Sequence, residues 1–482
     1  MGLQSSLFAG VAGLDANGSS ISIIGDNIAN TNTIGFKSSR AEFVDVLSGN
    51  LGGSAGSGSI GAGARLSGVS QNFTQGSLES TGVTTDLAVD GGGFFIVQDT
   101  TGVFYSRAGL FRLDANQVLV NNQGQSVQGF GVTPSGAPNG ALGSINLATV
   151  SSTPSQTAQI DINVNLDPND LALAGGAAGF DHTDPIATSN FQTGTRVFDS
   201  LGNPRNVLVY FRKDSAAANS WFYYAGVSRE DVNFSGFGAP YNTFTTATGN
   251  ESDFFPLQSG TLTFDTNGAL ITENNTALSF DYDRDGDGAI SGAESGAPLA
   301  TPGNAPTGWA FAGGAASGQV VAFDFGTTAT EGGTGTDRTT QYGGAAASGA
   351  NNFVRFLTQD GFTAGSLSSI DIDDNGFVTG AFSNGQTERL AQIALASFPN
   401  LSGLQRVGKN NFLESVGSGQ PVVGSPNQSG LGAIRSGFLE QSNTDLAEEF
   451  VRLILSQRAF QANTRTISTT NELLANLVVL GQ

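Results

Sequence analysis

Apolar residues recur with an alternating four-three spacing at both ends of the chain. Near the start the series is Leu7, Val11, Leu14, Ile21 and Ile28, with Gly18 and Gly25 in the remaining positions. Near the end it is Leu446, Phe450, Leu453, Phe460, Ile467, Leu474 and Val478. This spacing is a heptad seam, so it predicts a helix at each end that packs in the manner of a coiled coil.

The start of the second helix carries the clearer local signals. Asn443 or Thr444 is suited to cap it, and Asp445, Glu448 and Glu449 place negative charge on the first turn, where the helix dipole favours it. The second helix is therefore predicted to be the better formed of the two.

The first helix is interrupted by Gly10, Gly13, Gly18 and Gly25. Each glycine costs roughly 0.5–1 kcal/mol relative to alanine inside a helix, so the helix is marginal alone. We expect its stripe to be buried against the other terminal helix and against the ends of neighbouring chains. An ordinary buried helix pair in a monomer is the alternative.

Between the two ends, the apolar pattern is that of strands. Segments such as LAVDGGGFFIVQD and QVLVNNQG alternate apolar and polar residues between turn signals and predict a β meander. The segments NVLVYFRK, WFYYAGVSRE and GTLTFDTNGALI predict a second β region, and the pattern resumes with FVRFLTQDG and SSIDIDDNGFVTG. We therefore expect a mainly β fold with α-helical termini and discontinuous β domains in series.

Composition shifts suggest where these domains begin and end. Residues 1–35 with 440–482 are the terminal helical domain, 36–70 a connector, 71–150 with 366–439 a middle β domain, and 151–365 an outer β domain that includes an insertion at about 272–320. The connector includes GNLGGSAGSGSIGAGARLSGVS, whose composition is typical of a flexible linker.

Charge and rare residues then exclude several functions. With 20 Lys and Arg against 41 Asp and Glu, the net charge of −21 excludes nucleic-acid binding. The chain has no Cys and one His, His182, without a nucleophile motif beside it, so thiol, multi-histidine and triad chemistry are not expected. No uninterrupted apolar run approaches the ~18 residues that cross a bilayer, and no basic segment of a secretory signal precedes residue 37, so neither membrane insertion nor a cleaved signal is expected.

One acidic segment fits the calcium loop of twelve residues. Its predicted ligands are Asp283, Asp285, Asp287, Ala289 through its carbonyl, Ser291 and Glu294, with Gly286 at the sharp turn. The flanks do not form the usual helix pair, so a solvated acidic turn is the alternative. A second stretch, Asp371 to Gly376, begins in the same way but lacks the closing Glu and is interpreted as a hairpin turn.

Blocks at both ends resemble one protein family. The segment NIANTNTIGFK at 27–37 resembles the opening signature of bacterial flagellar rod and hook proteins, and 440–463 resembles their closing signature. The blocks at 90–97, 106–111 and 383–385 also agree, and RVFDSLGN at 196–203 is similar to the outer domain of a hook protein. The insertion at 272–320 has no counterpart in this pattern.

The resemblance implies a structural subunit of the flagellar hook, not an enzyme and without a required cofactor. It implies an extracellular homopolymer, exported unfolded by the flagellar export apparatus, with the hook cap protein, distal rod and hook-filament junction proteins as partners. The alternatives are a secreted, calcium-stabilised β-rich hydrolase or adhesin, and a distal rod subunit of the same family.

Overall fold

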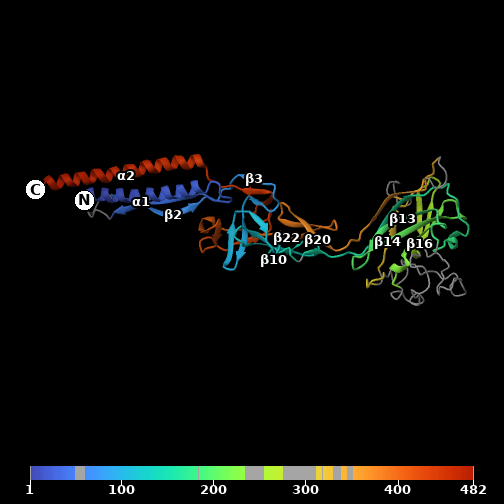
Figure 1. Cartoon of the computed structure of the whole chain (residues 1–482). Helices are drawn as coiled ribbons and strands as arrows, with labels where there is room; N and C mark the ends of the chain where they lie inside the picture. The colour runs from blue at the N-terminus through green and yellow to red at the C-terminus, as the bar shows by residue number, and fades with distance from the viewer. Residues whose placement is uncertain are drawn as a thin grey trace. The chain divides into compact units, whose positions relative to one another are not determined.

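The chain forms two compact units (Figure 1). The computed structural model describes residues 2–48, 60–148, 150–182, 184–233, 254–274, 311–316, 319–328, 338–344 and 351–480. The first unit is Met1–Val150 with Leu367–Gln482, and the second is Ser151–Ser366. Both ends of the chain therefore belong to one unit, and the second unit is inserted between its halves.

Two long helices of the first unit lie side by side (Figure 1). They are α1, Gly2–Ala29, and α2, Leu446–Leu480. Asp445 caps α2, because its side chain accepts hydrogen bonds from the N–H groups of Ala447 and Glu448 at 2.8 and 3.2 Å. The predicted pairing of terminal helices in a mainly β chain is confirmed, but the cap lies after the two predicted residues.

A hairpin occupies much of the predicted connector at 36–70. Strands β1, Ser39–Ser48, and β2, Ile60–Gln71, pair antiparallel, so the prediction of a linker is wrong for these residues. Gly, Ala and Ser are uncommon in strands, which is why the composition of this segment predicted a linker and not a hairpin. Their small size has a packing role, since a Cβ on Gly63 would lie only 2.8 Å from the Cβ of Ala12 in α1.

The rest of the first unit is a β region built from both halves of the chain. Strands from the N-terminal half are β3 Leu78–Ser80, β4 Leu87–Asp90, β5 Phe94–Asp99, β6 Gly102–Ser106, β7 Phe111–Leu113, β8 Leu119–Asn121, β9 Ser126–Val132 and β10 Pro138–Ser144. From the C-terminal half come β20 Gly365–Ile372, which begins in the second unit, β21 Phe377–Phe382, β22 Thr387–Ile393, β23 Leu395–Ser397, β24 Gln405–Gly408, β25 Asn411–Leu413, β26 Val422–Gly424, β27 Ala433–Ser436 and β28 Phe438–Glu440. The halves interleave, because β22 pairs with β9, β23 with β5, β25 with β6, β27 with β4 and β28 with β3.

Strand β5 divides the core of this region into two. Phe95 and Val97 face one buried apolar cluster, while Phe94 and Ile96 face another. Successive side chains of a strand point to opposite faces, so a continuous apolar run marks a strand that is covered on both sides.

The second unit combines two sheets. Its strands are β11 Ser151–Ser152, β12 Gln159–Asn165, β13 Phe191–Phe198, β14 Pro204–Lys213, β15 Ser220–Ser228, β16 Phe254–Phe264, β17 Leu270–Asn274, β18 Ala322–Asp324 and β19 Phe353–Gln359. Strands β13 to β17 form one sheet in chain order, and β12 lies between β18 and β19 in another. Their shared core contains the fully buried side chains of Trp221, Tyr223, Phe211 and Phe325.

One turn design recurs in five hairpins of the described chain. A side chain of Asp or Asn accepts hydrogen bonds from the N–H groups two and four residues later, at Asp114, Asn121, Asp199, Asp265 and Asp373. The residue three positions on has a positive φ and is Gly in all but one, where it is Gln117. The predicted hairpin turn at 371–376 is confirmed.

The turn at Asp265 gives a prediction for pH. The N–H of Ala269 lowers the pKa of the Asp265 carboxyl. Because this pKa is lower in the folded state, the turn contributes stability above the unfolded pKa of about 4 and loses it as pH falls through the folded value. We expect the difference in melting temperature between the wild-type chain and D265N to shrink from about pH 6 to about pH 2. A difference that stays constant over this range would contradict the assignment.

Candidate assembly surface and the junction that supports it

Where the two terminal helices approach most closely, glycines of α1 face Ile467 and Asn463 of α2. A Cβ on Gly10 would lie 2.9 Å from Cγ1 of Ile467, and one on Gly13 would lie 2.4 Å from Nδ2 of Asn463. Further along, the hydroxyl groups of Ser20 and Ser456 lie 3.3 Å apart. The order of these contacts makes the helices antiparallel, and Gly10 and Gly13 allow the close approach.

The predicted heptad seam lies beside this contact line. A straight α-helix drifts about 20° per heptad, so a strict seven-residue repeat rotates gradually around it. In α2 the repeat reaches the contact with α1 at Ile467, while Leu446 and Phe460 remain 42% and 40% exposed. Supercoiling would have kept the whole seam on one side.

The structure places the predicted seam residues in two groups. Leu7, Leu14, Ile21, Ile28, Leu453, Ile467 and Leu474 are half-buried, whereas Val11, Leu446, Phe450 and Phe460 are exposed. Val478 lies in the last turn of α2. The helix pair alone therefore does not bury the seam.

Further exposed apolar side chains, which the heptad count passed over, lie on α2. Val451, Ile454 and Leu455 are 57%, 48% and 60% exposed. With Phe450 they cover the side of the helix that faces away from Ser456 and Asn463. We call these four residues the apolar face of α2. Placing every apolar residue of α2 around the helix, and not only those at heptad positions, would have revealed this face.

Helix α1 is itself unusually apolar. Residues Ser6–Ala29 are long and apolar enough to cross a membrane, as judged by length and composition only. Counting uninterrupted apolar residues missed this property, because small residues raise the mean hydropathy without forming a run. Phe8 and Val11 are 65% and 50% exposed, so this helix also presents apolar surface.

The helices are joined to the β region at a buried carboxylate, Glu440. Its Oε1 accepts a hydrogen bond from the Lys37 ammonium at 2.6 Å, and its Oε2 from the Arg107 guanidinium at 3.3 Å. The N–H of Gly76 also donates to Oε1, at 2.9 Å. All three charged side chains are at most 5% exposed. We call Lys37, Arg107 and Glu440 the ion cluster.

The ion cluster contains two cations and one anion. Burial lowers the pKa of Lys37 and of Arg107, because removal from water disfavours the charged forms, while Glu440 acts in the opposite direction. Backbone carbonyls share the excess positive charge, since Lys37 donates to Thr74 O at 2.7 Å and Arg107 to Gly91 O at 2.9 Å. The carboxylate is thus the one anion between two buried cations.

Hydrogen bonds also join the segment after α1 to the residues around Glu440. The N–H of Gly35 donates to the carbonyl of Glu440 at 2.7 Å. Gly35 has φ +68°, and a Cβ there would lie 2.5 Å from the backbone nitrogen of Ala108. Asn443 accepts from the N–H of Ser38 at 2.8 Å. Within the segment 27–37, Gly35 and Lys37 are therefore the residues that this junction requires.

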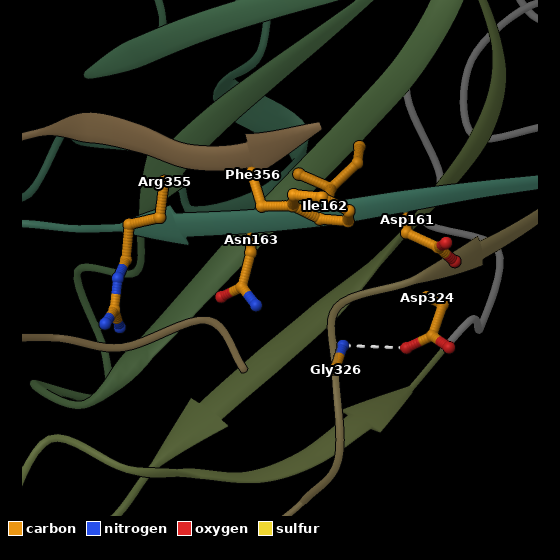
Figure 2. Close-up of a pocket in the computed structure, with 7 residues that line it drawn as sticks. All are labelled: Asp161, Ile162, Asn163, Asp324, Gly326, Arg355 and Phe356. Carbon is orange, nitrogen blue, oxygen red and sulfur yellow. Dashed lines mark hydrogen bonds between the residues drawn. The ribbon is translucent and has the colours of Figure 1, made fainter. Parts of the chain in front are cut away.

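Within the described residues, the second unit has a hollow of about 600 Å³ that Asp161, Asp324 and Arg355 help to line (Figure 2). Asp161 and Asp324 lie opposite each other in the parallel pairing of β12 and β18. The side-chain amide of Gln159 donates to both carboxylates, at 2.6 and 3.4 Å, and the N–H of Gly326 donates to Asp324 at 2.7 Å. The two acids thus serve as hydrogen-bond acceptors that tie neighbouring strands together.

The predicted calcium ligands at 283–294 lie outside the described residues. Within the described ranges, no group of three or more His, Asp or Glu could hold a metal ion. His182 is buried, with 7% exposure, in the second unit.

Comparison with known proteins gives three matching family models. They are the Flagellar hook protein FlgE/F/G D1 domain over residues 88–167, the Flagellar basal body protein FlaE D2 domain over 163–362, and the Flagellar basal body rod FlgEFG protein C-terminal over 435–479. The last of these covers β28 and most of α2. Together the models define a structural protein of the axial part of the bacterial flagellum.

Two relatives match along almost the whole chain. The Flagellar hook protein FlgE of Escherichia coli is 33% identical over 98% of each chain, and that of Borreliella burgdorferi is 31% identical over 99% of this chain and 100% of its own. The chain belongs to the flagellar hook protein family. It is a structural subunit of the hook, outside the cell, and not an enzyme. A solved structure of Helicobacter pylori hook protein FlgE2 matches 75% of this chain and 100% of its own at 14% identity, with a TM-score of 0.39.

The ion cluster gives a second prediction. Replacing Glu440 by Gln leaves Lys37 and Arg107 buried without an anion, so we expect the free energy of unfolding to fall by about 3–5 kcal/mol. Denaturant unfolding of the full chain, followed by circular dichroism, measures this loss.

The matched control for E440Q is D374N. It breaks an ion pair of the same unit, Asp374 with Arg435 at 2.9 Å, in which the side chains are 62% and 43% exposed. An exposed pair contributes less than about 1 kcal/mol, so this variant is expected to be nearly as stable as the wild type. Similar losses of unfolding free energy in both variants would show that the buried cluster contributes no more than an exposed ion pair.

Proposed function

We propose that copies of this chain polymerise into the hook tube through the exposed apolar surface of the terminal helices. The observation that supports this is the apolar face of α2, together with the exposed Phe8 and Val11 of α1. Contiguous apolar surface on one helix is typical of a protein interaction site. A second copy is the natural partner, since the chain belongs to a family of polymer subunits.

The energetics agree with this proposal. Burying a large aliphatic or aromatic side chain contributes about 1.5–3 kcal/mol, so several such residues per chain offset the entropy lost on association. Within one chain, Gly10 and Gly13 of α1 face Ile467 and Asn463, and the apolar face of α2 stays exposed and available to neighbours.

We also propose that the arrangement of inner, middle and outer parts transmits torque. In this proposal 1–35 with 440–482 form the inner helical part, 71–150 with 366–439 the middle β domain and 151–365 the outer β domain. The hairpin of β1 and β2 joins the inner part, since Gly63 packs on α1. Tight apolar contacts between inner parts hold the tube, and weaker contacts between outer domains let neighbours slide as a bent tube rotates.

Export and partners follow from the family. The proposal includes export in an unfolded state without a cleaved signal, assembly beneath the hook cap protein, and contacts with the distal rod and the hook-filament junction proteins. The absence of Cys suits a chain that must pass unfolded into an oxidising exterior.

Calcium binding at 283–294 is a separate part of the proposal. The spacing of oxygen ligands in this segment supports it, with Asp283, Asp285 and Asp287 before the sharp turn and Glu294 to close the site. The ion's role here is to order the loop and not to supply chemistry.

The assembly proposal is tested by acidic substitutions on α2. I454D and V451D each place a charge on the apolar face of α2, which the proposal buries between copies. We expect both variants to keep the β-sheet circular dichroism and unfolding transition of the wild type but to form no tubes in electron micrographs of concentrated protein.

The control for these variants is L171D, which adds the same charge at a 73% exposed Leu of the second unit. We expect this variant to assemble as the wild type does. Normal tubes from I454D would remove the apolar face of α2 from the interface, and absence of tubes from the wild type itself would count against polymerisation.

Calcium binding is tested by titration calorimetry. We expect the wild type to bind calcium and the double variant with Asp283→Ala and Glu294→Ala to lose this binding, because it lacks the first and last ligands. The control, Asp371→Ala with Asp374→Ala, removes two carboxylates from the other acidic turn and is expected to bind normally. No heat of binding from the wild type at about millimolar calcium would end this part of the proposal.

A further inference from the structure

A loop of the first unit presents one valine completely to solvent. Val416 has a relative exposure of 104%, so its side chain touches almost nothing in its own chain. It lies between β25 and β26, with Ser415 before it and Gly417 after it. A single exposed valine on a mobile loop needs no explanation. Whether this loop is rigid therefore decides whether Val416 is suited to contact another molecule.

The loop around Val416 is held by its own hydrogen bonds. The Ser415 hydroxyl donates to Gly403 O at 2.6 Å and accepts from the N–H groups of Gly417 and Ser418 at 3.0 and 3.2 Å. Ser418 is fully buried, and its hydroxyl accepts from the N–H of Ser415 at 2.8 Å.

Contacts with the preceding segment complete this support. Asn400 donates to Gly417 O at 2.9 Å. A Cβ on Gly403 would lie 2.2 Å from the carbonyl carbon of Gly417, so the two backbones are in direct contact. Val416 is thus an apolar tip on a preorganised loop, and little conformational entropy remains to be lost when the tip is covered.

The hairpin that leads into this loop is tied to the end of α1. Arg406 of β24 pairs with Asp26 at 2.9 Å, and its guanidinium lies 4.9 Å from the centre of the Phe36 ring. Asn410, at the turn between β24 and β25, donates to Ile34 O at 2.9 Å. These contacts fix the Val416 loop relative to the helices that carry the proposed assembly surface.

We propose that the Val416 tip is a second contact between copies of this chain, buried against apolar surface of a neighbour in the polymer. The inference rests on the proposed polymerisation. A second copy is the occupant because the loop is anchored to the end of α1, so a neighbour that covers the terminal helices is brought to the loop as well. The tip is a single uncharged, projecting aliphatic side chain, which suits an apolar protein surface and not a small ligand.

The absence of Cys makes a direct test available. In the variant V416C the only thiol of the chain is at the tip, so its reaction with a maleimide reports the exposure of this position alone. We expect labelling in assembled tubes to be at least about tenfold slower than in monomers, and to recover when the tubes are dissociated. Equal rates in tubes and monomers would overturn the inference while leaving the polymerisation through α1 and α2 intact.

A second measurement separates assembly from folding. V416S removes apolar surface that is unburied in the monomer, so we expect the melting temperature to stay unchanged while the protein concentration needed for tubes rises about tenfold. The matched variant L171S changes a similarly exposed residue of the second unit and is expected to assemble at the wild-type concentration. An unchanged concentration for V416S would overturn the inference, and so would a rise that is equal in both variants.

Discussion

The structure of the first unit depends on one buried carboxylate. Glu440 receives Lys37 from the N-terminal segment and Arg107 from the β region, and it stands six residues before α2 begins. A buried ion pair is favourable only when its hydrogen bonds are complete, because each charge loses its hydration. The cluster joins three segments that are distant in the sequence, so it can form only when all three meet.

The small residues of α1 determine how closely the two terminal helices approach each other. Gly10 and Gly13 let α2 approach α1 closely, whereas Gly18 and Gly25 have no neighbouring atom within 4 Å of an added Cβ. Several large apolar side chains, among them Phe450 and Leu455, nevertheless remain exposed. A helix pair built the other way round, with large apolar residues between the helices, would be more stable alone and would have less apolar surface for neighbours.

Sequence patterns predicted the element types well and their contacts less well. The terminal helices, the mainly β fold and the turn at Asp373 follow from periodicity and turn chemistry, which are local properties. The heptad seam predicted the wrong contact line between the helices. A seven-residue repeat stays on one side only if the helices supercoil, and it drifts around a straight helix. The hairpin of β1 and β2 was missed since its small residues are explained only by the proximity of α1 at Gly63. The ion cluster joins positions 37, 107 and 440, a pairing that no local pattern contains.

The order in which these contacts form bears on when the assembly surface appears. Helix α1 is weak alone, and α2 can dock on it only when residues more than 400 positions apart have come together, as the separation of Lys37 and Glu440 illustrates. An incomplete ion cluster leaves a buried charge unpaired, so partial structures in which one terminus has not arrived are disfavoured. The apolar face of α2 is then held in its assembly geometry only in chains that have folded at both ends. Under the proposed export in an unfolded state, this coupling would delay the organisation of the surface proposed to join copies until both ends of the chain have folded.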